Sequence, residues 1–238
     1  MNKENSLFAA VGLLLGLIVG FMGANYMNRN AAPVGALDAN NPLAGLPPDH
    51  PAVQQGQLSQ QAMQEIQAAT EKAEAEPQNF DAQLKAGELS YQLQRYDDAI
   101  KYLVKANELQ PDNYSVIVNL GNANFDATKF TEAEKWYAKA LEQKADDVNV
   151  RTDMGLTFIF REPPDYDRAV EEFIKALEVK PDHPQTLQNL VVAYAKKNDA
   201  AKANETLAKL EDADPGNQAI PKLKEEIAKV SAPGSGSE

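Results

Sequence analysis

Carboxylates that could act as a general acid and a general base stand next to each other at two places, Asp97-Asp98 and Asp146-Asp147. Such chemistry needs two carboxyl groups whose surroundings separate their pKa values. Both pairs fall where we expect solvated turns and helix starts, so nothing there separates the two values. A carboxylate at a helix start instead interacts favourably with the helix dipole and accepts hydrogen bonds from backbone amides. We therefore interpret these aspartates as helix-capping residues.

Metal-ligating and nucleophilic residues are equally sparse. The two histidines, His50 and His183, each lie in a Pro-Asp-His-Pro sequence, and nothing suggests a third or fourth ligand. We therefore favour two separate turns over a shared metal site. Without cysteine, the chain has no disulfide, thiolate metal site, covalent haem attachment or lipoprotein anchor. No Walker loop, dinucleotide glycine motif, zinc-protease helix or nucleophile elbow is present, so we predict no enzymatic activity and no cofactor.

The chain is acidic, with 23 lysines and arginines against 35 aspartates and glutamates and a formal net charge of −12 over 238 residues. Nearly all of this charge lies after residue 56. Nucleic-acid phosphates need a basic protein surface, so the charge argues against DNA or RNA as a partner. It favours basic or neutral partners, although salt screens such long-range effects.

The main regularity of the sequence is a repeat that occurs four times. Each copy has a small residue followed by alanine twelve positions later, or fourteen in the third copy: Gly87 with Ala99, Gly121 with Ala133, Gly155 with Ala169, and Val191 with Ala203. Counted between the residues that close each copy, from Pro77 to Pro215, the steps are 34, 34, 36 and 34 residues. A fixed period in this range is typical of a solenoid of helical repeats.

The residue types of the repeat predict two antiparallel helices that cross closely. The small residues let the two backbones approach, and large apolar residues four positions after the alanine fill the space (Leu103, Tyr137, Phe173 and Leu207). Aromatic residues three positions before the alanine close the turn in three copies (Tyr96, Phe130 and Tyr166). A proline then ends the second helix in most copies.

These positions resemble the tetratricopeptide repeat family over residues 78–215. The resemblance implies an all-α fold, a right-handed α-solenoid of helix-turn-helix repeats, whose concave face binds peptide segments of other proteins. In that family the first helix of each pair lines the concave groove. Carried over residue by residue, the groove positions are Leu84, Glu88, Tyr91 and Gln92; Val118, Asn119, Asn122, Phe125 and Asp126; Asn149, Thr152, Asp153, Leu156, Ile159 and Phe160; and Gln188, Asn189, Val192 and Lys196.

One known use of that groove departs from this sequence. Family members that clamp the terminal carboxylate of a client place lysines and an arginine where this chain has Leu84, Asn149 and Asp153, and only Asn119 matches. Recognition of a chaperone C-terminus is therefore not expected. The remaining aromatic and apolar side chains could hold apolar groups, and the amides could bond a peptide backbone.

The predicted boundaries follow from composition and pattern. They comprise a short tail (1–6), a transmembrane helix (7–27), a Pro- and Gly-rich linker (28–56), a capping helix or half-repeat (57–77), four repeats (78–111, 112–145, 146–181 and 182–215), a C-terminal capping helix (216–230) and a disordered tail (231–238). The third repeat carries two extra residues at 161–165, REPPD, where two prolines exclude a helix. We expect an exposed loop there, with a partner contact as the alternative.

Residues 7–24, LFAAVGLLLGLIVGFMGA, carry no charge and are just long enough to span the hydrocarbon layer of a membrane. A cleaved signal peptide is the alternative, but a good cleavage site does not follow at the right distance. Gly12, Gly16 and Gly20 lie on one face of this segment. They form either a ridge for packing against another membrane helix or glycines without a special role.

Orientation in the membrane is weakly encoded, because Lys3 and Arg29 are the only basic residues near the span. We expect the span in a bacterial inner membrane with the repeats in the periplasm, and the cytoplasmic face is the alternative. The sequence thus predicts a membrane-anchored protein-binding scaffold, assembly factor or chaperone. Its layout is similar to periplasmic repeat proteins of the secretion translocon and of cytochrome c maturation. A self-associating structural component and an accessory that positions a separate enzyme remain alternatives.

Overall fold

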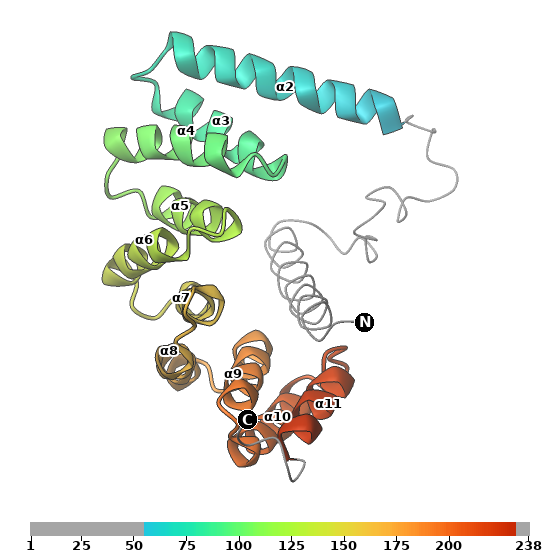
Figure 1. The fold of residues 1–238 in the computed structure, drawn as a ribbon. Coiled ribbons are helices and arrows are strands. Elements are labelled where there is room, and N and C mark those ends of the chain that lie inside the picture. The colour runs from blue at the N-terminus through green and yellow to red at the C-terminus, as the bar shows by residue number, and fades with distance from the viewer. Residues whose placement is uncertain (1–54, 232–238) are drawn as a thin grey trace. The chain divides into compact units, whose positions relative to one another are not determined.

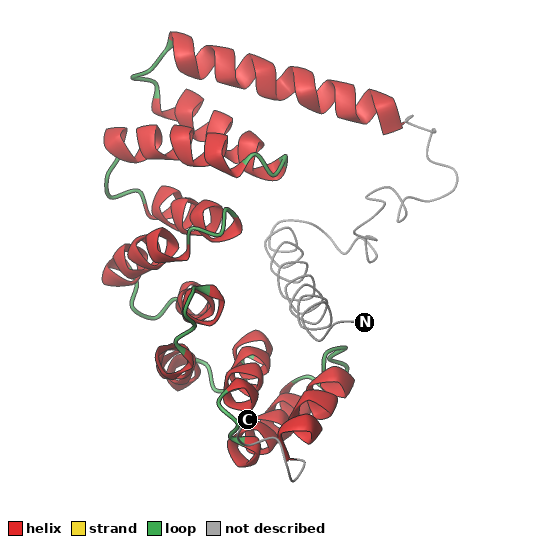
Figure 2. Cartoon of the chain, viewed as in Figure 1, coloured by secondary structure: helices red, strands yellow, loops and turns green. Residues whose placement is uncertain are grey.

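The computed structural model describes residues 55–231, and all regular structure in this range is helical, with ten helices and no strand (Figure 2). The chain divides after Gln67 into two compact units, and the fold described below is that of the second. The predicted tail, transmembrane helix with Gly12, Gly16 and Gly20, most of the linker and the C-terminal tail from 232 lie outside the described residues. No helix within 55–231 is both long and apolar enough to cross a membrane.

The helices follow one another through short connections. They are α2 (Gln55–Ala75), α3 (Phe80–Gln92), α4 (Tyr96–Leu109), α5 (Tyr114–Asp126), α6 (Phe130–Gln143), α7 (Val148–Phe160), α8 (Tyr166–Val179), α9 (Pro184–Lys196), α10 (Ala200–Ala213) and α11 (Ile220–Ser231). Gln55 and Gly56, which the sequence placed in the linker, are helical. The two prolines of the third repeat's insertion, Pro163 and Pro164, lie in the connection between α7 and α8, because proline is unfavourable inside a helix.

Consecutive helices from α3 to α11 pack against one another, which makes the fold an α-solenoid of four helix pairs. The first helices α3, α5 and α7 lie on one side of the stack and their partners α4, α6 and α8 on the other (Figure 1). First helices of neighbouring pairs also touch, α3 with α5 and α7 with α9. Helix α11 contacts α9 and α10 through the buried side chains of Ile220, Leu223 and Ile227.

The crossing within each pair has the geometry that the repeat predicts. A Cβ atom added to Gly121 would lie 2.5 Å from Tyr137 Cε1, and one added to Gly87 would lie 2.8 Å from Leu103 Cγ. The third pair has the same arrangement, with the ring of Phe173 against Gly155. The large side chains are fully buried because the missing Cβ gives them their space.

The aspartates considered above for acid–base chemistry are held at helix starts. Asp147 Oδ1 accepts hydrogen bonds from the backbone amides of Asn149 and Val150 at 3.0 and 3.1 Å, and Oδ2 accepts one from the Tyr114 hydroxyl at 2.7 Å. Asp97 and Asp98 lie in the first turn of α4. The capping role predicted for Asp147 is confirmed.

Candidate functional site

The predicted groove residues occupy two environments. Six of the twelve principal candidates are half-buried, and all of these lie on α3 and α5: Leu84, Glu88, Tyr91, Asn119, Asn122 and Asp126. The other six are buried, and most lie on α7 and α9: Phe125, Thr152, Leu156, Ile159, Gln188 and Val192. The first two repeats therefore carry most of the polar candidate surface.

Thr152, one of the predicted groove residues, is fully buried and takes part in hydrogen bonds between helices. Its hydroxyl, fully buried, donates to the carbonyl of Val148 at 2.7 Å and lies 2.6 Å from Thr186 Oγ1. Thr186 in turn lies 2.7 Å from Nδ1 of His183, the residue just before α9. If His183 donates to Thr186, the three side chains form one chain of hydrogen bonds that joins the third and fourth repeats. His183 thus lies at the turn before α9 and contacts Thr186, which in turn contacts Thr152 on α7.

Leu156 on α7 and Gln188 and Val192 on α9 are also buried. For the two residues on α9, the packing of neighbouring helices explains the burial. Helix α9 is packed against α7, α8, α10 and α11, so its predicted groove face has neighbours on several sides. Val192 is 9 % exposed and Gln188 is 7 % exposed, whereas Leu156 on α7 is fully buried. The position of a residue within the repeat predicts the helix face on which it lies, but packing of the surrounding helices determines how far it is buried.

On α3 and α5 the candidate residues form a joined aromatic and acidic group. The hydroxyl of Tyr91 donates a hydrogen bond to Asp126 Oδ2, and the Tyr91 ring lies 5.7 Å from that of Tyr96 at an interplanar angle of 57°. Tyr137 donates to Asn122 Oδ1 at 2.9 Å. We call Tyr91, Tyr96, Asn122 and Asp126 the Asp126 cluster, and Glu88 lies about one helical turn before Tyr91 on α3.

A second aromatic group lies beside this cluster and joins the second repeat to the third. The ring of Phe125 meets those of Phe130 and Phe160 edge-on, at centroid distances of 5.3 and 5.8 Å. Phe130 and Phe160 are 6.1 Å apart. Phe125 is buried, whereas Phe160 is half-buried, so Phe160 keeps part of its ring at the surface.

Burial controls the charges in and beside the Asp126 cluster. It raises the pKa of Asp126, and the Tyr91 hydrogen bond opposes this rise. Burial also raises the pKa of Glu88, against the attraction of Lys85. The pKa of the fully buried Tyr137 is raised well above its usual value by burial and then by the negative charges of Asp153 and Asp126 and by Tyr91. The carboxylates of Asp126 and Glu88 are thus partly shielded from solvent.

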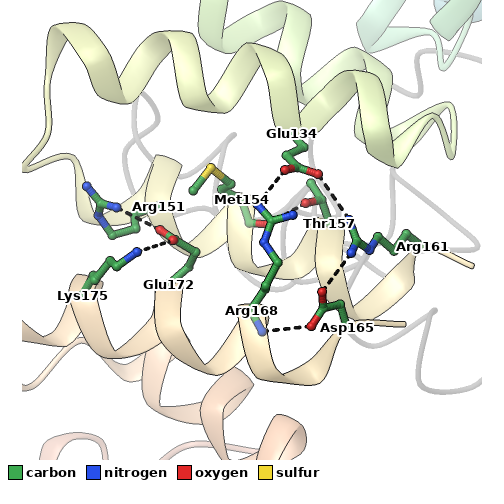
Figure 3. A network of polar contacts seen from close by, with 9 residues as sticks. All are labelled: Glu134, Arg151, Met154, Thr157, Arg161, Asp165, Arg168, Glu172 and Lys175. Atoms are coloured by element: carbon green, nitrogen blue, oxygen red, sulfur yellow. Dashed lines mark hydrogen bonds and ion pairs between the residues drawn. The ribbon is translucent and has the colours of Figure 1, made fainter. Parts of the chain in front are cut away.

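Figure 3 shows a network of ion pairs at the insertion of the third repeat. The sequence analysis did not predict this network. Glu134 on α6 pairs with Arg161 at 3.4 Å and with Arg168 at 2.8 Å, and Arg161 also pairs with Asp165 at 2.9 Å. Both guanidinium groups lie over the ring of Phe158, at 5.0 and 4.0 Å. The insertion is therefore fastened at both ends, and Glu162 and the two prolines between them are exposed.

A neighbouring ion pair lies between α7 and α8 in the same view (Figure 3). Arg151 Nη1 lies 2.9 Å from Glu172 Oε2, and Lys175 Nζ lies 2.7 Å from Oε1 of the same carboxylate. The side chains of Arg151 and Glu172 are 15 % and 10 % exposed. These contacts satisfy both carboxylate oxygens with cations, which explains why burial of Glu172 is tolerated.

Among residues 55–231, no group of three or more histidine, cysteine, aspartate or glutamate side chains is placed to hold a metal ion. The Asp126 cluster contains two tyrosines and a carboxylate that accepts a hydrogen bond from one of them. Its chemistry is that of a surface that attracts cations and apolar groups.

Comparison with known families gives the class of this protein. A tetratricopeptide repeat model matches residues 91–152 and 164–227, together more than half of the chain, and a second tetratricopeptide repeat model matches residues 52–114. The chain belongs to the tetratricopeptide repeat family. Comparison with curated protein sequences gave no significant match.

Solved structures of similar fold support this assignment. A crystal structure of MamA protein has 22 % identity and a TM-score of 0.60, over 74 % of this chain and 90 % of that one. The structure of YrrB, described as a TPR protein with an unusual peptide-binding site, has 21 % identity and a TM-score of 0.60, over 71 % and 86 %. MamA 41-end from Desulfovibrio magneticus RS-1 has 17 % identity and a TM-score of 0.58, over 68 % and 93 %. At these identities the likeness establishes the fold.

Proposed function

We propose that this protein is a scaffold that binds polypeptide segments of other proteins along the first helices of its repeats. The observation that carries the proposal is the Asp126 cluster with its neighbour Phe160. It offers half-buried aromatic, amide and carboxylate groups from α3, α5 and α7 on a tetratricopeptide array. Such side chains can contact both the apolar and the polar groups of a bound peptide. The peptide-binding site named for YrrB, a protein of the same fold, supports the assignment.

Peptide selection with the purified full chain tests this proposal. A displayed library of random 15-residue peptides should yield binders that compete with one another for one site. Phe160→Ala should weaken their binding about tenfold, because it removes an aromatic contact. Ile174→Ala is the control, since Ile174 is an exposed apolar residue on α8. If the full chain selects no peptide, or if the two variants bind alike, this surface is not the binding site.

We also propose that residues 7–27 hold the array at a bacterial inner membrane, with the repeats in the periplasm. The uncharged length of LFAAVGLLLGLIVGFMGA supports this, and the Pro-rich linker that follows would let the array reach clients near the bilayer. Tethering would raise the effective concentration of the array beside membrane clients, so modest affinity would suffice. Assembly factor, chaperone, translocon accessory and cytochrome c maturation factor are all compatible with this role.

Membrane extraction separates anchoring from peripheral binding. The full chain should stay with membranes after alkaline carbonate washing, and a chain lacking residues 1–27 should be released. Protease added to spheroplasts should degrade the repeats if they are periplasmic. Release of the full chain by carbonate would contradict anchoring, and protection of the repeats from protease would place them on the cytoplasmic side.

A further inference from the structure

We propose that the Asp126 cluster selects a positively charged segment of the partner polypeptide, with a lysine or arginine side chain placed against Asp126 and the tyrosine rings beside it. This proposal rests on the proposed function, because it names the chemistry of the segment that the array binds. Three observations support it: the geometry of the cluster, the distribution of ion pairs over the repeats, and the apolar groups next to the carboxylate.

The geometry joins one carboxylate to aromatic rings. Asp126 comes from the last turn of α5, and its hydrogen bond from Tyr91 uses one of the two carboxylate oxygens. The ring of Tyr96 lies 5.7 Å from that of Tyr91, and burial, followed by the charge of Asp126, raises the pKa of Tyr96. An ammonium or guanidinium group can pair with a carboxylate and contact a tyrosine face at the same time.

Ion pairs are distributed unevenly over the repeats. Several carboxylates on the second helices have cationic partners: Asp97 pairs with Lys129, Glu134 with Arg168, and Glu172 with Lys175. Within the described residues, neither Asp126 nor Glu88 takes part in an ion pair. Both are nevertheless partly buried, and burial raises the pKa of each. Lys85 lies on the same helix as Glu88 and offsets part of its charge, whereas no cation of the described residues contributes to the pKa of Asp126. The charge of Asp126 would therefore attract a cation.

The surroundings of the carboxylate favour a peptide over a free ion. No group of metal-binding residues occurs in the part of the chain that the structure describes. Phe125 follows Tyr91 at the equivalent position of the next repeat, and its ring contacts the half-buried Phe160. A segment with a basic residue and a neighbouring apolar residue would therefore meet a matching surface at both points. An acidic segment would be repelled.

Fluorescence anisotropy with the full chain and matched peptides tests the proposal. The probe is a labelled 12-residue peptide with lysines and leucines interspersed among glycine and serine, and its two relatives carry glutamine or glutamate in place of lysine. We expect the lysine peptide to bind most tightly and the glutamate peptide most weakly. Asp126→Asn should weaken the lysine peptide about tenfold or more, because it removes the charge but keeps an acceptor for Tyr91.

Asp212→Asn is the matched control, because it removes the same charge from an exposed position on α10. It should change binding of the lysine peptide less than twofold. Glu88→Gln removes the half-buried carboxylate about one helical turn before Tyr91 and provides a second variant. Circular dichroism checks that each variant keeps its helices. The glutamine peptide should bind the parent and Asp126→Asn alike.

Other outcomes would overturn the proposal in recognisable ways. Equal effects of Asp126→Asn and Asp212→Asn would mean that only the net charge attracts the peptide. Tighter binding of the glutamine or glutamate peptide would end the cationic assignment but leave peptide binding intact. Light scattering that shows a dimer which the lysine peptide cannot dissociate would mean that a second copy of the chain covers this face. No binding by any of the three peptides would count against the proposed function itself.

Discussion

Gly121 on α5 lies so close to Tyr137 on α6 that a Cβ atom on the glycine would be 2.5 Å from the tyrosine ring. Tyr137 is fully buried and donates a hydrogen bond to Asn122, so its ring cannot move away freely. We expect Gly121→Ala to destabilise the chain by about 1–2 kcal/mol, since overpacking outweighs the gain in helix propensity. Urea unfolding followed by circular dichroism measures this difference.

Gly216→Ala is the control for that variant. Its added Cβ would lie 3.9 Å from Asp214 Oδ1, an ordinary contact, so we expect a change within about 0.5 kcal/mol. If Gly121→Ala were as stable as the parent, the close crossing would not depend on glycine.

A second prediction concerns the turn between α5 and α6. Thr128 has a φ of 59°, in the left-handed region, which is unfavourable for a β-branched residue. Asn198 holds the same conformation, with the same φ, at the equivalent turn between α9 and α10. Thr128→Asn should therefore stabilise the chain by roughly 0.5–1 kcal/mol, because asparagine tolerates this region better. The midpoint of thermal unfolding would rise, and the converse change Asn198→Thr should lower it.

The ion pair between Arg151 and Glu172 gives a third prediction. Arg151→Met removes one cation from a nearly buried carboxylate, and Lys175 remains to compensate part of the charge. We expect a loss of about 2 kcal/mol, less than the full cost of an isolated buried charge. The double variant Arg151→Met/Glu172→Met should lose less than the sum of the single variants. In the exposed pair of Lys209 with Glu205, Glu205→Gln should leave the urea midpoint of unfolding nearly unchanged.

The fourth prediction is a pH dependence of stability that comes from Asp126. Its pKa is raised in the folded chain, so between the unfolded and folded values the folded chain binds more protons. Stability from this group therefore increases as pH falls from neutral through that window and decreases as pH rises. Glu88 acts in the same direction, whereas the lowered pKa values of Asp199 and Glu205 act in the opposite one.

Comparison of Asp126→Asn with the parent isolates this contribution. Burial raises the pKa values of Tyr96 and Tyr137, so these two groups do not titrate in the window. At pH 7 the variant should unfold at a temperature higher by roughly 1–3 °C, and the difference should shrink towards pH 4. A variant that is less stable at pH 7 would show that the charge of Asp126 contributes to folding.

The helical pairs and their period could be predicted from the residue pattern. Gly87, Gly121 and Gly155 indicated where helices cross, and Leu103, Tyr137 and Phe173 indicated what fills the space, because these contacts are local and recur at fixed spacing. Pro163 and Pro164 marked an interruption that the structure places between α7 and α8. Asp147 as a helix cap followed from residue type and position alone.

Which candidate residues remain near the surface could not be predicted, because it depends on contacts between repeats. Thr152 and Leu156 occupy positions whose equivalents in the first two repeats are half-buried, yet both are fully buried, and Thr152 contacts Thr186 of the next repeat. The pairs Tyr91–Asp126 and Arg168–Glu134 join residues about one repeat apart, and their distances depend on how each helix pair is rotated on the next. Small-residue spacing fixes the crossing within a pair, but the rotation between pairs depends on packing over whole helices, which no local pattern encodes.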